Sequence, residues 1–363
     1  MTLNNQFVDR GKVGNTPALT TRADETFMDY ISDMRNFLMH APYKRVTELS
    51  EETLRRTKTR NDQWPKCADP VRDALSTEPE VATWLRAKRT LQEAYWARIM
   101  DSYNQRGGTL KQKLDAADKS GPGSVKWDPN FPMPEYATVD IHIQPGGYVN
   151  EDLGGFYYDY GTKVFFGGVN DGDARHTKMA EKTALPKDGN VSRTLDLGTG
   201  IGQLPVAIKR LFPKADVWAI DIGAPMVRYA HLRAMEQGVD VNFVQMASEK
   251  LDFPSGHFDL VTAHLLFHEI PLPIIEATVR EAFRVLRPGG TFVIWDFASV
   301  DPGKNPYAGF ARTLDAADNG EPYSVEFVNC NIEKLGEQTG FKLRYAAEED
   351  IARHGRVLDK PAA

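Results

Sequence analysis

Three glycines at alternate positions follow an apolar run in the stretch TLDLGTGIG. Gly198, Gly200 and Gly202 predict a backbone that turns sharply after a buried strand and that no side chain covers. In an α/β sheet such a turn opens a helix whose free N–H groups can receive a ligand. Asp221 ends a second apolar run, VWAID, about twenty residues later, where a carboxylate can accept both hydroxyls of a ribose. The turn and the acid together predict a nucleoside-binding site, whereas a tight turn without a ligand is the alternative.

The glycine spacing also distinguishes between classes of nucleoside-binding protein. The dinucleotide fingerprint G-x-G-x-x-G requires its third glycine at the position of Gln203. This chain has instead the pattern D-x-G-x-G-x-G, which starts at Asp196. The spacing therefore argues against a nicotinamide-dependent dehydrogenase.

The pattern that begins at Asp196 resembles motif I of the class I S-adenosylmethionine-dependent methyltransferases. Three later segments resemble the same family in the same order: DFPSGHFDLVTAHLLFHEIP, RVLRPGG followed by TFVIWDF, and EPYSVEFVNCNIEKLGEQTGF. The last of these is similar to the closing helix and strand of the type-11, ubiquinone/menaquinone-methyltransferase-like branch. The resemblance covers roughly residues 185 to 346. It implies a Rossmann-like, doubly wound α/β sheet with S-adenosyl-L-methionine as the cofactor.

The resemblance implies how this cofactor would lie on the sheet. The glycine turn would carry its methionine part, and Asp196 would hold the amino group. Asp221 would accept the ribose hydroxyls, and Ile222 would pack on the adenine. His264 would lie beside the methionine portion, close to the transferred methyl group.

The adenine edge is where this chain departs from the family. The resemblance places Ala247, Ser248 and Glu249 along that edge, and many members have an aspartate in place of Ala247. Ser248, Glu249 or a backbone carbonyl would then replace it. The implied cofactor-binding residues are Asp196, Gly198, Gly200, Gly202, Asp221, Ile222, Ala247, Ser248, Glu249 and His264.

Two histidines after the predicted fourth strand are the first candidate catalytic residues. Where the acceptor carries a proton, a base of near-neutral pKa assists methyl transfer, and histidine is the usual choice. The stretch AHLLFHEIP holds His264 and His268, and Glu269 follows directly. A structural role for either histidine is the alternative.

An aromatic, glycine-rich block, GGYVNEDLGGFYYDYGTKVFF, precedes the predicted cofactor-binding domain. Class I methyltransferases commonly cover their active site with such elements, and aromatic faces attract a sulfonium cation, so we expect a lid. A static hairpin with a packed aromatic core is the alternative. Tyr158 and Tyr160 belong to this block, and Tyr160 is a third candidate catalytic residue. The candidate substrate-binding residues are His142, Tyr148, Tyr157, Arg175 and Tyr323.

The elements that must position these residues divide the chain into three parts. From Arg193 onward, strand-like and helix-like segments alternate, which predicts a mainly parallel sheet with helices on both faces. Apolar residues at helical spacing predict helices over 25–38 and 80–103, and alternation in ATVDIHI predicts a strand over 137–143. The predicted parts are a helical N-terminal region that caps the site or mediates dimerisation (1–125), a connector and lid (126–184) and the methyltransferase domain (185–363).

The composition narrows the function. The 363 residues include 44 basic and 50 acidic ones, and the net charge of −6 argues against nucleic acid as a partner. Cys67 and Cys330 form neither a disulfide framework nor a metal-ligand pattern, and no apolar run is long enough to span a membrane. We therefore expect a cytoplasmic enzyme, alone or as a homodimer, that methylates a nitrogen, oxygen, sulfur or carbon atom of a small molecule without a metal. The alternatives are an RNA or protein methyltransferase and a non-catalytic regulator that binds the cofactor.

Overall fold

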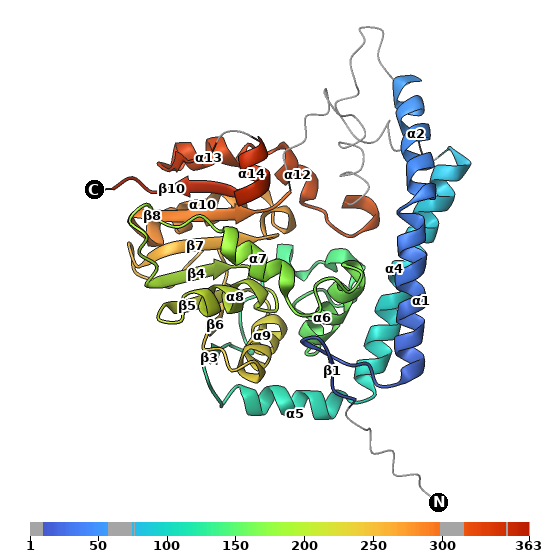
Figure 1. The fold of residues 1–363 in the computed structure, drawn as a ribbon, viewed down its shortest axis with the longest axis horizontal. Helices are drawn as coiled ribbons and strands as arrows, with labels where there is room; N and C mark the ends of the chain where they lie inside the picture. Colours follow the sequence, from blue (N-terminus) through green and yellow to red (C-terminus); the bar gives the residue numbers. More distant parts are fainter. Residues whose placement is uncertain (1–9, 57–74, 76, 298–315, 346–347, 363) are drawn as a thin grey trace, which may run out of the picture.

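The computed structural model describes residues 10–56, 75, 77–297, 316–345 and 348–362, so Cys67 lies outside the described part. A large sheet forms one layer of the molecule, and long helices stand beside it as a column (Figure 1). The strands of this sheet are β3 (Ser124–Lys126), β4 (Arg193–Leu197), β5 (Asp216–Asp221), β6 (Asn242–Gln245), β7 (Phe258–His264), β8 (Leu286–Trp295), β9 (Lys342–Leu343) and β10 (Arg356–Asp359).

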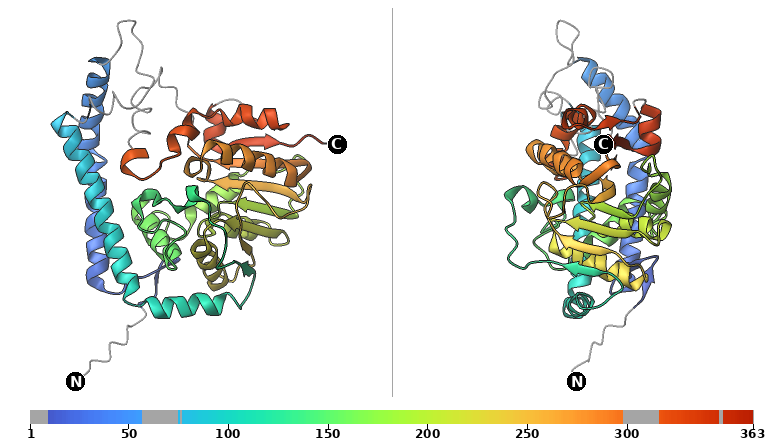
Figure 2. Two further views of the ribbon diagram at one scale, coloured as in Figure 1. Left: turned by 180° about the vertical axis from the view of Figure 1, so that it is seen from behind. Right: turned by 90° about the vertical axis from the view of Figure 1, so that its left-hand side faces the viewer.

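Helices surround the sheet and build the column. α1, α2 and α4 make up the column, and α6 lies between it and the sheet (Figures 1 and 2). The described helices are α1 (Arg22–Leu38), α2 (Ala41–Arg56), α4 (Pro79–Asn104), α5 (Gly107–Ala117), α6 (Gly154–Phe165), α7 (Ala174–Lys182), α8 (Gln203–Leu211), α9 (Ala224–Glu236), α10 (Leu272–Val285), α12 (Ser324–Asn329), α13 (Ile332–Thr339) and α14 (Glu348–His354). The 3₁₀ turns are η1 (Glu135–Thr138), η2 (Ile141–Ile143) and η3 (Phe267–Glu269), and a small hairpin consists of β1 (Lys12–Val13) and β2 (Thr16–Pro17).

The sheet is doubly wound, as the sequence predicts. Its strand order is β3-β6-β5-β4-β7-β8-β10-β9, in which the pairs from β3 to β8 are parallel and β10 is antiparallel to both neighbours. Successive side chains of a strand point to opposite faces. Ala219 of β5 packs in the cluster that contains α8 and α9, whereas Ile220 packs in the cluster that contains α10 and α13. Helices therefore cover both faces of the sheet.

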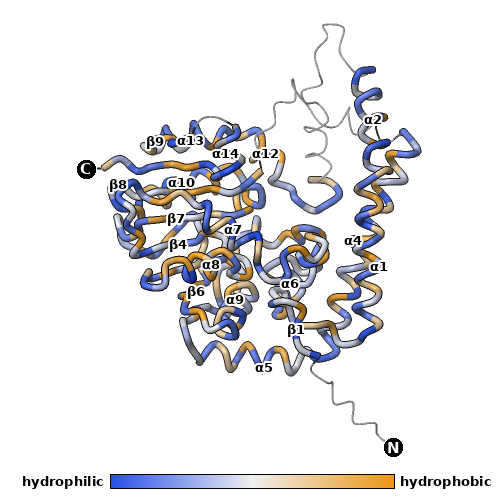
Figure 3. Tube along the Cα trace, in the orientation of Figure 1, coloured by the Kyte–Doolittle hydropathy of each residue, from blue (hydrophilic) through white to orange (hydrophobic). Residues whose placement is uncertain are grey.

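Two predicted helices of the N-terminal region are confirmed, and two further helices, α2 and α5, were not expected. α1 begins after Thr21, because the side chains of Thr21 and Asp24 cap its first turn reciprocally. α4 begins with Pro79, which suits a first turn because an N–H there has no helical partner. Pro42 ends the periodic pattern of α1, but it lies in the first turn of α2. Apolar and polar stretches alternate along α1 and α4, as expected for helices that pack on one side (Figure 3).

The strand predicted over 137–143 is wrong, and so is the static hairpin that was the alternative to a lid. Residues 137–143 fall around the turns η1 and η2, and the aromatic block after them forms α6. Gly155 marks the close approach of α6 to α9 instead of a turn, because a Cβ on Gly155 would lie 2.3 Å from the Cβ of Tyr229. The aromatic side chains consequently point to different faces of one helix. Tyr160 lies in the core between the helices, whereas Tyr158 lines a cavity beside the sheet.

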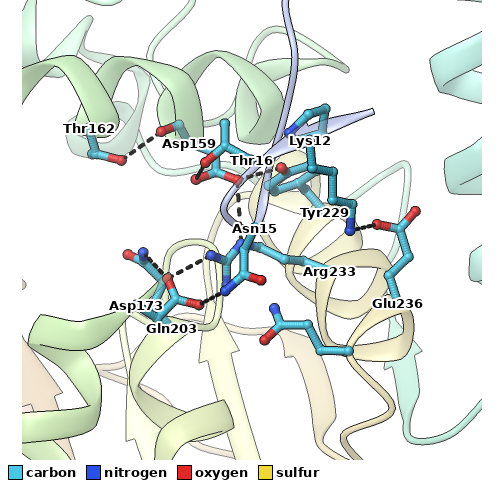
Figure 4. Close-up of polar contacts among 12 residues, drawn as sticks. Lys12, Asn15, Thr16, Asp159, Thr162, Asp173, Gln203, Tyr229, Arg233 and Glu236 are labelled. Atoms are coloured by element: carbon cyan, nitrogen blue, oxygen red, sulfur yellow. Dashed lines mark hydrogen bonds and ion pairs between the residues drawn. The ribbon is translucent and has the colours of Figure 1, made fainter. Parts of the chain in front are cut away.

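The buried guanidinium of Arg233 on α9 joins the sheet layer to the segments around it (Figure 4). Its Nη2 donates to Asp173 Oδ1 at 2.6 Å, and its Nε donates to Asp159 Oδ2 at 3.4 Å. Further donors to these two carboxylates are Asn15, Thr16, Gln203 and Tyr229. A charge taken out of water is tolerated only when it is paired and hydrogen-bonded. The cluster therefore holds α6, α7, α9 and the N-terminal hairpin in one arrangement.

Arg233→Met should lower the free energy of unfolding by about 3–5 kcal/mol, because it leaves the carboxylates of Asp159 and Asp173 buried without a counter-ion. Lys12→Met is the matched control. Lys12 of β1 pairs with Glu236, which lies on α9 like Arg233, but these two side chains are 34% and 31% exposed. The free energy of unfolding should therefore fall by less than about 1 kcal/mol in Lys12→Met. Urea unfolding measures both variants, and equal losses would contradict the role given to Arg233.

Candidate active site

The glycine turn after β4 has a backbone that suits its sequence. Gly198, Gly200 and Gly202 have φ values of 63°, 53° and 77°, in the left-handed region that residues with a Cβ rarely adopt. A Cβ on Gly198 would lie 2.7 Å from Leu266 Cδ1, so a larger residue has no room there. α8 begins at Gln203 directly after the turn, and the N–H groups of its first turn have no partners within the helix.

Asp221 and Asp196 are buried carboxylic acids beside this turn. Asp221 ends β5, and its two oxygens accept from the N–H groups of Gly200 and Gly223, each at 2.9 Å. Burial raises the pKa of Asp221 to about 6, although these bonds favour its charged form. Asp196 accepts from the Thr262 hydroxyl at 2.6 Å, and burial raises the pKa of Asp196 to about 7. A ligand that donates hydrogen bonds or carries positive charge would favour the charged form of both acids.

A cavity of about 1150 Å³, counted with the space at its mouth, lies at the carboxyl ends of β4, β5 and β7. The predicted site residues in its wall are Tyr148, Asp196, Gly198, Gly200, Asp221, Ile222, Ser248 and His264. The predicted site residues outside its wall are His142, Tyr157, Tyr160, Arg175, Gly202, Ala247, Glu249, His268 and Tyr323. Wall residues to which the sequence assigned no role include Tyr136, Met226, Met246, Leu265, Leu266 and Glu269. Met246 and Leu265 directly follow β6 and β7, and this position could have predicted that they line the site. Nothing in the sequence around Tyr136 predicted its place in the wall.

Of the residues predicted along the adenine edge, Ser248 alone reaches the cavity wall. Its hydroxyl, however, bonds with the Thr278 hydroxyl at 2.9 Å. Glu249 accepts from the Tyr136 hydroxyl at 2.7 Å; burial and this carboxylate raise the pKa of Tyr136. The Ser248 hydroxyl and Glu249 Oε1 are thus engaged within the protein, whereas Glu249 Oε2 is buried without a partner among the described residues. Which group replaces the family's aspartate at Ala247 stays a prediction.

The structure separates the two candidate histidines. His264 ends β7 and lines the cavity, where its ring packs edge-to-face on His176 with centroids 5.1 Å apart. Burial lowers the pKa of His264 to about 4, so its ring is neutral at pH 7 and is a weak base. His268 lies behind the wall with Nδ1 2.8 Å from Asp296 Oδ1. Burial opposes the charge of His268, but Asp296 raises its pKa overall, and the pair anchors η3 to the end of β8.

A polar cluster lies at Glu269 on the cavity wall. Its Oε1 accepts from the Tyr148 hydroxyl at 3.0 Å and lies 3.5 Å from His142 Nε2. His142 Nδ1 lies 3.1 Å from Glu321 Oε1. Burial by itself lowers the pKa of His142, but the two carboxylates raise it to about 10, so the ring is charged at pH 7. His142 and Tyr148, which the sequence predicts as substrate contacts, thus meet at one acid.

Two tyrosines predicted from the aromatic block point away from the cavity. Tyr157 donates from its hydroxyl to Asn104 Oδ1 at 2.7 Å. Tyr160 is buried edge-on against Tyr103. The helical winding of α6 turns both side chains into the helical core. The structure therefore does not support contacts of Tyr157 and Tyr160 with a molecule in the cavity.

Two further predicted substrate contacts lie just behind the wall. The Arg175 guanidinium stacks on the ring of Phe166, 4.2 Å from its centroid, and Phe166 is the residue that reaches the cavity. The Tyr323 hydroxyl donates to the backbone oxygen of Tyr136 at 3.4 Å. Both side chains support wall residues in this arrangement.

Within the stretches that the structure describes, no group of histidine, cysteine, aspartate and glutamate side chains is arranged to hold a metal ion. In the same stretches no helix has both the length and the apolarity needed to cross a membrane. Cys330 is a partly exposed free thiol, and burial raises its pKa.

Residues 194–290 match the family described as "Methyltransferase domain". The chain is 36% identical over 131 residues to demethylmenaquinone methyltransferase of Thermus thermophilus, which covers 36% of this chain and 58% of the relative. It is 34% identical over 144 residues to the ubiquinone/menaquinone biosynthesis C-methyltransferase of Pseudomonas putida, covering 39% and 54%. The chain thus spans a little over half the length of these curated relatives. A solved phosphoethanolamine N-methyltransferase of Haemonchus contortus, in complex with S-adenosyl-L-methionine, has a TM-score of 0.42 at 18% identity, over 61% of this chain and 48% of that one.

The charge on His142 should make the stability of the Glu269 cluster depend on pH. The pKa of His142 is about 10 in the fold and about 6.5 in the unfolded chain, so its stabilisation is complete below about pH 6.5 and is lost as the pH rises through 10. His142→Gln should therefore lower the free energy of unfolding most at about pH 6, and the difference from the wild type should shrink toward pH 10. Urea unfolding across this range measures the difference. A difference that stays constant with pH would contradict the charged state.

Proposed function

Residues 194–290 form a class I S-adenosylmethionine-dependent methyltransferase domain, and from that premise we propose that this chain transfers a methyl group to a small-molecule acceptor. One observation carries the proposal. The glycine turn and the buried Asp221 line the same cavity as a second polar cluster around Glu269. A transferase needs a site for the donor and a site for the acceptor in one enclosed space.

The residues present suit S-adenosylmethionine. The uncovered backbone at Gly200 leaves room for its methionine part, and Ile222 offers an apolar surface to the adenine. Burial raises the pKa values of Asp196 and Asp221, so it disfavours their charged forms. An ammonium group beside Asp196 and ribose hydroxyls beside Asp221 would stabilise these charged forms. When bound, the cofactor supplies a methyl group on a positively charged sulfur.

The lining of the cavity, the names of the relatives and the net charge favour a small acceptor. The wall that contains Asp221 also contains Glu269, so a small acceptor would lie beside the donor in the same cavity. The names of the curated relatives from Thermus thermophilus and Pseudomonas putida also specify small-molecule acceptors. An RNA methyltransferase would need a basic surface, and the net charge of −6 argues against one.

Asp221→Ala should weaken the binding of S-adenosylhomocysteine at least about 100-fold, because two hydrogen bonds to a charged group are lost. Asp216→Ala is the matched control, since Asp216 lies at the exposed, opposite end of β5. Isothermal titration calorimetry measures both affinities. Unchanged affinity in Asp221→Ala would exclude the ribose contact.

Labelled S-adenosylmethionine and a deproteinised extract of the source cells test the activity itself. The label should move into the small-molecule fraction when the protein is added. Transfer to protein or RNA supplied in parallel reactions would identify a different class of acceptor. Binding of S-adenosylhomocysteine without transfer to any fraction would favour a non-catalytic regulator.

A further inference from the structure

The strand order divides the cavity into two halves. β5 and β6 lie on one side of β4, and β7 and β8 lie on the other. Asp221 ends β5 and Ser248 follows β6, so the residues expected to bind the ribose and the adenine belong to the first half. His264 and Glu269 follow β7 and belong to the second half. The second half is therefore where an acceptor would lie beside the donor.

Glu269 is the acid in the wall of this second half. Three groups surround its Oε1: the Tyr148 hydroxyl at 3.0 Å, His142 Nε2 at 3.5 Å and His268 Nε2 at 3.9 Å. Among the described residues, none donates a hydrogen bond to Oε2. A carboxylate accepts hydrogen bonds through both oxygens. The contacts at Oε1 thus orient the carboxylate of Glu269, and Oε2 can accept a hydrogen bond from a molecule in the cavity.

The N-terminal region holds His142, the cationic side chain nearest to Glu269, in a strained conformation. His142 has φ 56° and Ile143 has φ 51°, in the left-handed region that is costly for both residue types. The His142 carbonyl accepts from Gln92 Nε2 at 2.8 Å and from Trp96 Nε1 at 2.9 Å, both on α4. Such strain persists only where surrounding contacts enforce it, and it is concentrated at functional sites.

We propose that Glu269 binds the hydrogen on the acceptor's nucleophilic atom and takes up that proton during methyl transfer. The acceptor is then a small molecule that carries an O–H or N–H group at the methylated position. This inference rests on the proposed function and specifies its substrate class.

The step balances in atoms and charge. A lone pair on the acceptor's oxygen or nitrogen forms a bond to the methyl carbon, and the carbon–sulfur bond breaks with its electron pair on sulfur. The positive charge leaves the sulfur, and the acidified O–H or N–H proton moves to Glu269 Oε2. The resulting carboxylic acid returns the proton to solvent when the product leaves.

The other titratable groups around Glu269 are less suited to take this proton. His142 is already charged at pH 7, because the carboxylates beside it raise its pKa to about 10, and the ring of His264 packs edge-to-face on His176. Tyr148 keeps its proton and donates a hydrogen bond to Glu269, and the pKa of Tyr148 is raised by burial and by that carboxylate. His268 is paired with Asp296 at 2.8 Å. Glu321 also has an oxygen without a partner, but it lies outside the cavity wall, so Glu269 is the acid beside His142 that a molecule in the cavity can reach.

Glu269→Gln tests the catalytic role once the wild type has methylated an acceptor from the cell extract. Its turnover should fall about 100-fold or more, the contribution typical of a general base, while its affinity for S-adenosylhomocysteine stays within about twofold. Glu276→Gln on α10 is the matched control, because Glu276 lies outside the cavity wall. Turnover of Glu269→Gln within about threefold of wild type would overturn the role of Glu269, as would methylation of an atom in an acceptor that has no O–H or N–H group there.

A second readout needs neither acceptor nor cofactor. Nitrogen-15 NMR of the histidine rings, with His142→Gln used for assignment, follows the protonation of His142 directly. Its midpoint should lie well above neutrality in the wild type and fall by at least about one pH unit in Glu269→Gln. An unchanged midpoint would overturn the contact between His142 and Glu269. If the wild type transfers no methyl group, the proposed function fails, and this titration still decides whether the pair exists.

Discussion

The charge of Arg233 has to be compensated inside the protein, and the positions of the surrounding elements follow from that constraint. Asp159 on α6 and Asp173 before α7 both reach this one guanidinium. Thr16 brings the N-terminal hairpin to Asp159, and Gln203 shares Asp173. Gln203 is the first residue of α8 and lines the cavity. The same ionic cluster thus connects the N-terminal region, α6 and the start of the helix that follows the glycine turn.

α6 links the ionic cluster to the site, because one face of this helix packs in the helical core and another lines the cavity. Tyr160 packs into a core shared with α1, α4, α5 and α9, and Tyr158 and Thr162 line the cavity. The close contact at Gly155 packs α6 directly against α9. The helices of the N-terminal region therefore pack directly behind α6 and help to position the cavity wall.

The polar cluster at Glu269 depends on the same arrangement. Gln92 and Trp96 of α4 bond to the backbone of His142, and Gln92 also donates to Asn319 beside Glu321. Three segments distant in the chain are required before Glu269 has its partners. Because each buried polar group needs its hydrogen bonds, displacement of any one segment would leave several groups unpaired at once.

The sequence alone determined the strands β4 to β8, the glycine turn and Asp221, because these features rest on short-range patterns: alternation of apolar residues, helix periodicity and the backbone freedom of glycine. It did not determine the structure of 137–165, where alternation and aromatic residues suit a strand or a helix equally well until a packing partner is known. Nor did it bring Glu269 to Tyr148, 121 residues away, or Asn319 to His142, 177 residues away. A local pattern shows that a side chain will be buried but not against what. Tertiary packing alone decided which acids and histidines share one wall, because burial forces distant polar groups to satisfy one another.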